Sequence, residues 1–163
     1  MNLVASTDPI LKTAALPFEF GDQMPVNPIE LYNDMAKFML EKSGLGLSAN
    51  QVGLPYRFFV MRAEEVIGCF NPKIVDFGEQ TVYLDEGCLS FPGLFIKVKR
   101  PANIKVRYTE PNGNTVTRKF SGMSARIFQH ELDHLDGVTY KQRAARIHLE
   151  RAERAKHAAK KAK

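Results

Sequence analysis

Six residues in the last third of the chain have the types and the spacing of a metal site. Residues 129–134 read QHELDH, so that His130 and His134 lie four positions apart. In a helix such residues stand one above the other and can bind a single ion. Glu131 is rotated by about 100° from His130, where its carboxylate can reach a water molecule on that ion. The pattern predicts two metal ligands and a general base, and the alternative is two surface histidines beside a solvated glutamate.

A third ligand is needed, and Cys88 is the strongest candidate for it. It lies in the run EGCLS at 86–90, at the end of a strand-like segment. Two imidazoles and one thiolate leave a metal ion one open position, which is typical of catalytic sites. The alternative for Cys88 is a buried and unreactive thiol. That second interpretation is the one that we give to Cys69.

Two other classes of metal protein stay open at this point. A zinc endopeptidase would need a third ligand outside Cys88, and Glu150 and Glu153 follow at suitable distances, although in a polar tail. One type of such protease has a third histidine six residues after the second, but this chain has Tyr140 there, which argues against that type. A binding module with a closed structural zinc would need a fourth ligand, such as Cys69, His148 or His157.

Three motifs in the same order resemble those of the peptide deformylase family. The run GLGLSANQ at 44–51 is similar to the family pattern G-x-G-L-A/S-A-x-Q, while 86–90 and 129–134 match E-G-C-L-S and Q-H-E-x-D-H. Three ordered matches are far more specific than any one of them alone. Together with a capped helix expected at 28–43, the resemblance covers most of the chain except its C-terminal tail.

The resemblance implies an enzyme that removes the formyl group from the N-terminal formyl-methionine of newly made polypeptides. A metal-bound hydroxide would attack the formyl carbon, with Glu131 as the general base. The metal ligands would be Cys88, His130 and His134. The usual ion of the family is Fe(II), and Zn(II), Ni(II) or Co(II) would also suit one thiolate and two imidazoles.

The resemblance also implies how the substrate would be held. The Gln51 side chain and the Leu89 backbone N–H would hold the formyl oxygen, and Gly46, beside Leu45, would offer its backbone to the peptide. In the first motif, Ser48 and Asn50 read as tolerated variations.

Two arginines near the motifs leave questions open in the sequence. Arg126 lies one turn before His130, close to the expected methionine pocket. The sequence does not show whether its side chain fills part of that pocket, so the depth of the pocket is not predicted. Arg100 could pair with Glu86 to support the Cys88 segment, or the two could form an ordinary surface ion pair.

The elements that must position these residues are predicted from periodicity and from helix and turn signals. Asn27 is expected to cap a helix over 28–43 as part of a capping box, with Gly44 at its C-cap, followed by a loop over 44–53. A second helix is expected from Met123 to Leu135, with Met123 and Ile127 on its inward face. Asn112-Gly113 predicts a hairpin turn. Strands are expected at 56–61, 66–69, 81–84, 95–99, 104–108 and 116–120.

This order of elements predicts an α+β fold in one domain. The resemblance adds antiparallel sheets packed around a central helix that carries the two histidine ligands. We expect the catalytic domain to cover residues 1–140 and a basic, helical tail to cover 141–163.

The charge of the chain is concentrated in that tail. Residues 141–163 hold nine Lys/Arg and two acidic residues, a charge of +7, so the preceding residues carry −2 of the net +5. The hydrophobic content of 44% and the charged content of 25% exclude a disordered chain. A basic tail on an acidic domain is either a solvated surface helix or a contact with an acidic polymer, for which ribosomal RNA is the expected partner. Neither a membrane span nor an import or secretory signal is evident, so we expect a cytoplasmic protein of bacterial or viral origin.

Overall fold

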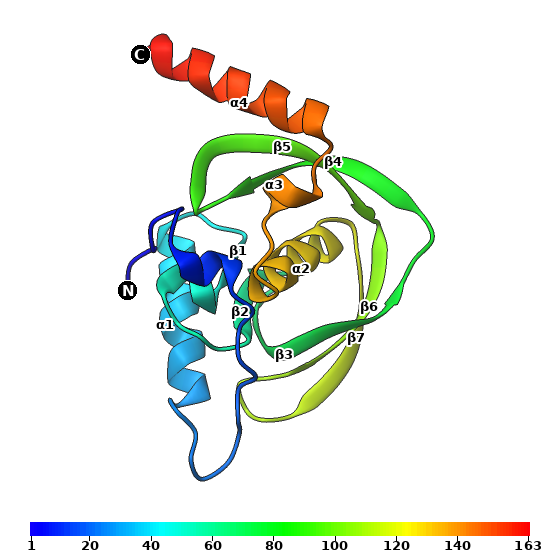
Figure 1. Ribbon diagram of the computed structural model, residues 1–163. Coiled ribbons are helices and arrows are strands. Elements are labelled where there is room, and N and C mark those ends of the chain that lie inside the picture. The colour runs from blue at the N-terminus through cyan, green and yellow to red at the C-terminus, as the bar shows by residue number, and fades with distance from the viewer.

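The computed structural model, which describes all 163 residues, is an α+β structure in one domain, as predicted (Figure 1). No helix in it has both the length and the apolar content needed to span a lipid bilayer. The elements in chain order are η1 (Pro9–Lys12), α1 (Pro28–Glu41), β1 (Gly46–Ser48), η2 (Ala49–Val52), β2 (Phe58–Arg62), β3 (Val66–Phe77), β4 (Thr81–Cys88), β5 (Phe91–Pro101), β6 (Asn103–Thr109), β7 (Thr115–Ser121), α2 (Gly122–Leu135), α3 (Tyr140–Arg143) and α4 (Arg146–Lys161).

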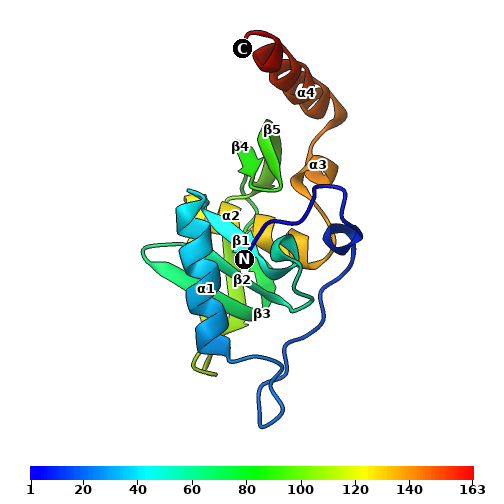
Figure 2. The same ribbon diagram turned by 90° about the vertical axis from the view of Figure 1, so that its left-hand side faces the viewer.

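Two antiparallel sheets surround α2. The larger sheet has the strand order β1-β2-β3-β6-β7, and β4 pairs with β5 in the smaller one. Figure 2 shows α1 on one side of the larger sheet and α2 on the other. The expected arrangement around a central helix is therefore confirmed.

Strand β2 of the larger sheet is buried on both faces, which explains its continuous apolar run. Side chains alternate between the two faces of a strand. Phe59 and Met61 belong to a core cluster shared with α2, whereas Phe58 and Val60 pack in a second cluster with α1. A strand covered on both faces has no position left for a polar residue.

The Asn27 cap of the first predicted helix is confirmed, but the predicted capping box is not formed, and the predicted end is wrong. The Asn27 side chain accepts hydrogen bonds from the backbone N–H groups of Ile29 and Glu30, at 2.9 and 3.1 Å. At the other end Ser43, with φ +55°, takes the left-handed position that we assigned to Gly44. Gly44 instead lies close to Leu89, whose Cδ1 would have to move because a Cβ at position 44 would lie 2.8 Å from it.

The predicted loop over 44–53 is partly ordered into regular structure. It contains β1 and the short helix η2, both too short for a periodic sequence signal. The predicted hairpin at Asn112-Gly113 is confirmed, because β6 and β7 pair from Asn103↔Ser121 to Thr109↔Thr115. The strands predicted at 81–84 and 95–99 extend into β4 and β5, whose ladder runs to the pair Cys88↔Phe91.

The second predicted helix is confirmed as α2, with one correction on its inward face. Ile127 is buried, but Met123 is 52% exposed because it lies in the first turn, at the rim of a cavity. The tail is helical as predicted and is divided into α3 and α4. Figure 2 shows α4 at the end of the molecule, beyond β4 and β5. Its first half packs on β5 through Leu149 and Ala152, and none of its residues is buried.

Candidate metal centre

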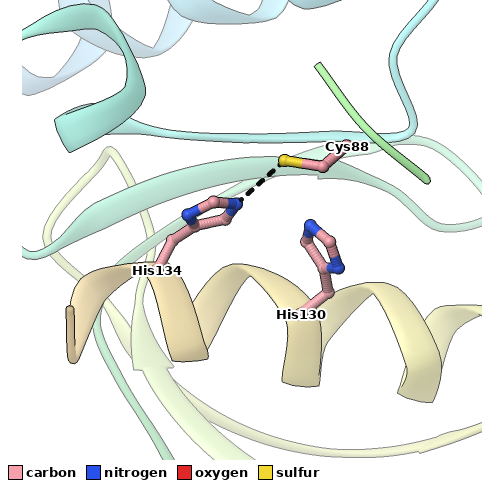
Figure 3. Close-up of side chains that lie close together, drawn as sticks. All are labelled: Cys88, His130 and His134. Atoms are coloured by element: carbon pink, nitrogen blue, oxygen red, sulfur yellow. Dashed lines mark hydrogen bonds between the residues drawn. The ribbon is translucent and has the colours of Figure 1, made fainter. Parts of the chain in front are cut away.

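Helix α2 and the end of β4 bring together the three residues predicted as metal ligands. His130 and His134 lie one helical turn apart and face Cys88 across the site (Figure 3). The Cys88 Sγ atom is 3.3 Å from His134 Nε2. One potential ligand atom from each residue lies within 4.8 Å of the others, and no other group of three His, Cys, Asp or Glu residues does so. One thiolate and two imidazoles at this spacing fit a divalent transition-metal ion.

Glu86 orients the first histidine. Its Oε1 lies 2.8 Å from His130 Nδ1. Because an ionised carboxylate only accepts hydrogen bonds, Nδ1 carries the proton and Nε2 is left to bind an ion. Burial by itself raises the pKa of Glu86, but the hydrogen bonds from His130 and Arg100 outweigh it and hold the pKa well below its ordinary value. Glu86 is therefore ionised in the folded protein at neutral pH.

The pair of Glu86 with Arg100 is buried rather than a surface ion pair. Arg100 donates from Nε to Glu86 Oε2 at 2.6 Å and from Nη2 to Oε1 at 3.0 Å. Its Nη1 donates to Asp133 Oδ2 at 2.8 Å. Both carboxylates thus share one guanidinium directly behind the histidines, which supports the first of our two interpretations.

Arg126 is also turned into this network and away from solvent. Its Nη1 donates to Glu86 Oε2 and to the carbonyl of Val98, both at 2.8 Å, while Nη2 donates to the carbonyl of Val82. The guanidinium therefore joins α2 to both strands of the smaller sheet. This contact answers the question left by the sequence, because the charged end of Arg126 is fully engaged at the wall of the cavity.

The two histidines have opposite electrostatic surroundings. Burial, together with the charge of His130, lowers the pKa of His134 well below its ordinary value, so this imidazole is neutral, the form that binds metal. For His130, burial also lowers the pKa, but hydrogen bonds with Cys88 and Glu86 outweigh it and raise the pKa to about 10. An ion that binds His130 must therefore displace a proton.

Glu131 points from α2 toward β1. Its Oε2 accepts a hydrogen bond of 2.6 Å from the hydroxyl of Ser48. Burial raises the pKa of Glu131, which suits a carboxylate that must take up a proton. Gly46 lies against the same side chain, since a Cβ at Gly46 would lie 2.7 Å from the Glu131 carboxyl carbon. Glycine at 46 is therefore required by the close approach of Glu131.

The amide of Gln51 has a fixed direction. Its Oε1 accepts a hydrogen bond of 2.9 Å from the backbone N–H of Ser48. Its Nε2 donates to Ser90 Oγ at 3.0 Å and lies 3.6 Å from Cys88 Sγ. The donor end of the amide consequently faces the ligands, where a charged oxygen could be bound.

The remaining predicted site residues lie around one cavity of about 390 Å³. Leu45, Gly46, Gln51, Leu89 and Glu131 all line it, together with Cys88 and His130. Exposed apolar side chains stand at its rim, of which Leu45 is 48%, Phe95 66% and Met123 52% exposed. The structure thus gathers residues from three distant sequence motifs around a space large enough for a side chain and its flanking peptide.

The residues required by the two alternatives, a zinc endopeptidase and a binding module with a structural zinc, do not lie at the site. The carboxylates of Glu150 and Glu153 lie on α4 outside the ligand group, and Glu150 pairs instead with Arg146 at 2.7 Å. None of Cys69, His148 and His157 joins the ligand group as a fourth member. Burial in the core raises the pKa of the Cys69 thiol well above its ordinary value, which confirms it as an unreactive thiol.

Three residues of the site were missed or undervalued by sequence reasoning. Asp133 accepts hydrogen bonds from Arg100 and also from Arg143 of α3, at 2.8 Å each. Its place inside the QHELDH run was the available signal. Asn50 donates to the backbone carbonyl of His134, and Ser48 bonds to Glu131, although both read only as tolerated variations.

Comparison with known proteins places this arrangement in a family context. A family model described as polypeptide deformylase matches residues 1–150. The peptide deformylase of Thermotoga maritima is 40% identical over 132 residues, which cover 80% of this chain and 79% of that protein. That of Caldanaerobacter subterraneus is 40% identical over 142 residues, 86% of each chain. The structure of a Synechococcus elongatus peptide deformylase in complex with actinonin has a TM-score of 0.87 at 32% identity, covering 96% of this chain and 85% of that one.

Proposed function

The chain belongs to the polypeptide deformylase family, and from this premise we propose that it is a metal-dependent hydrolase that removes the formyl group from N-formylmethionine of newly made polypeptides. One observation carries the proposal. The donor atoms of Cys88, His130 and His134 converge beside a buried glutamate and an oriented amide. The thiolate and imidazoles suit Fe(II), which we propose as the native ion, and would also bind Zn(II), Ni(II) or Co(II).

When bound, the divalent ion would supply a water molecule of lowered pKa and polarise the formyl oxygen. Glu131 is the residue placed to move protons. Its Oε2 is held by Ser48, and the carboxylate lines the cavity one residue after a ligand. Glu131 would take the proton of the attacking water and deliver it to the nitrogen of the departing amine, so that formate and a free N-terminus are released.

Gln51 and Leu89 are the proposed donors to the formyl oxygen as it gains negative charge. An amide nitrogen has two hydrogens, and Gln51 Nε2 uses one of them for Ser90. The second points to Cys88 Sγ at 3.6 Å, a long bond that would be exchanged for one to the formyl oxygen, and the Leu89 backbone N–H follows Cys88 in the cavity wall. Each such donor contributes roughly 10²–10³ to the rate in comparable sites.

Strand β1 is the proposed docking edge for the substrate backbone. It lies at the edge of the larger sheet, with β2 as its single neighbour. An extended peptide can add to such an edge through main-chain hydrogen bonds. Gly46 and Leu45 lie at the cavity end of that edge, so a peptide paired there would present its N-terminal residue to the ligands.

Formate release from a short formyl-methionyl peptide tests this proposal. Protein purified without oxygen and loaded with one equivalent of Fe(II) or Ni(II) should release formate, and an N-acetyl-methionyl peptide should be turned over far more slowly. Cys88→Ala should lose both metal and activity, because only the two imidazoles would remain as ligands. A fully metal-loaded protein that releases no formate would overturn the proposal.

We also propose that the basic tail contacts ribosomal RNA in the cytoplasm, where formylated chains emerge. Helix α4 leaves its basic side chains in solvent, and its first half partly covers β5 through Leu149 and Ala152. A triple change of Arg154, Lys160 and Lys161 to Gln therefore removes charge and retains those contacts. It should weaken ribosome binding most at low salt and leave turnover of a short formyl peptide unchanged. Equal ribosome binding would contradict the contact, and the boundary at residue 140 stays a prediction.

A further inference from the structure

Ser48 contacts both Glu131, the proposed general base, and Gln51, a proposed donor to the formyl oxygen. Its side chain is fully buried in β1. The hydroxyl lies 2.6 Å from Glu131 Oε2, and the backbone N–H donates to Gln51 Oε1 at 2.9 Å. The first of these bonds depends on the side chain and the second does not, so the two effects can be separated by mutation.

The carboxylate of Glu131 accepts a hydrogen bond from the hydroxyl on one side and lies close to the backbone of Gly46 on the other. A Cβ at Gly46 would collide with Glu131 Oε1, which shows how closely β1 approaches that oxygen. The hydroxyl of Ser48 has a single proton, and Oε2 is a closer acceptor than the Glu131 carbonyl, which is 3.1 Å away. A hydrogen bond to a charged oxygen is stronger than one to a neutral carbonyl. The principal bond of Ser48 is therefore to the carboxylate.

We propose that Ser48 is a positioning residue for deformylation, which holds the Glu131 carboxylate in the orientation needed for proton transfer. The inference rests on the proposed function. An alanine at 48 would keep the backbone bond to Gln51 and leave Glu131 Oε2 without its donor. The carboxylate would then have more than one orientation, and only part of the population would be aligned with the reacting atoms.

Ser48→Ala tests the inference through the separation of kcat from KM. We expect kcat to fall roughly ten- to a hundred-fold, the scale of a lost hydrogen bond to a charged group, while KM and bound metal stay constant. Ser48→Thr retains the hydroxyl and should recover most of kcat. The matched control is Val60→Ala, at the buried residue of β2 that pairs with Leu47 and packs in the cluster with α1. It should lower the melting temperature without lowering kcat.

A double-mutant cycle keeps the test independent of how well the threonine fits. Glu131→Asp shortens the carboxylate, so that it no longer reaches the Ser48 hydroxyl. If Ser48 acts through Glu131, adding Ser48→Ala to Glu131→Asp should reduce kcat by less than two-fold. The same fold loss in both backgrounds, or an unchanged kcat in Ser48→Ala alone, would overturn the inference. An inactive, metal-loaded wild type would instead refute the proposed function, so the two failures are distinguishable.

Discussion

Replacement of Glu86 by Gln should damage stability and metal binding together. Four donors surround the carboxylate: Arg100 Nε and Arg126 Nη1 at Oε2, and Arg100 Nη2 and His130 Nδ1 at Oε1. A glutamine has the same shape, but its amide nitrogen must face two donors in either orientation. At least two of the four bonds are lost, and Arg126 loses its one carboxylate partner.

The expected loss follows from the burial of this network. Glu86 and Arg100 are each 5% exposed and Arg126 is 3% exposed. Removing one partner of such a buried ion pair costs about 3–5 kcal/mol in the free energy of unfolding. Loss of the bond that orients His130 should also weaken metal affinity by roughly 10- to 100-fold. Urea unfolding of the metal-free protein measures the first quantity, and competition with a chelator measures the second.

A surface ion pair in the same chain provides the control. Arg146 and Glu150 lie 2.7 Å apart, but their side chains are 91% and 44% exposed. Arg146→Gln should therefore change the free energy of unfolding by less than about 1 kcal/mol. If Glu86→Gln behaves like Arg146→Gln and keeps its metal affinity, the network does not support the site, and the reasoning is refuted.

The pH dependence of the same variant has a definite sign. The folded pKa of Glu86 is depressed, so the carboxylate contributes its full stability above the unfolded pKa of about 4.3. That contribution is lost as the pH falls from there toward the folded pKa. The stability difference between wild type and Glu86→Gln should consequently narrow below about pH 4.3. A difference that stays constant from pH 7 to pH 3 would contradict this assignment.

Three further outcomes are expected. Glu131→Ala should keep its metal and lose roughly 10²–10⁴ in turnover, whereas loss of the metal itself, measured by elemental analysis, would make Glu131 a ligand. The iron-loaded enzyme should be inactivated by air or peroxide through oxidation at Cys88, and replacing the iron by Ni(II) or Co(II) should protect activity. Equal half-lives of activity in air for the iron-loaded and nickel-loaded protein would count against this. Metal affinity should rise between pH 6 and pH 8, because the ion displaces a proton from His130, whose pKa is raised to about 10. Chelator competition at each pH measures that affinity, and an affinity that does not change with pH would exclude the displacement.

The parts of this site that sequence predicts well are those with local spacing. His130 and His134 can be placed on one face of a helix from periodicity alone. Asn27 predicts a helix start for a similar reason, since its side chain accepts hydrogen bonds from residues only two and three positions ahead. The proposed ligand Cys88 was identified by its residue type and by a motif, and its contact with His134 spans 46 residues.

The parts that sequence did not predict depend on partners far along the chain. The bond from Ser48 to Glu131 spans 83 residues, and the bond from Arg100 to Asp133 spans 33. No periodicity links such positions, because the sheet register and the packing of α2 bring them together. Met123 was placed inward by the same periodicity that was right for Ile127, since helical spacing does not show where the covering sheet ends.

The wide sequence separation within the site has a consequence for how the protein is made. Gln51 contacts Cys88 over 37 residues, and Cys88 contacts His134 over 46. Contacts of this span close late, because the loops between them must first lose their conformational freedom. A growing chain that ends before His134 therefore has no complete ligand set, however well α1 and β2 have formed. We therefore expect metal loading at the proposed ligands to follow synthesis of almost the whole domain, so that newly made copies first pass through a metal-free stage.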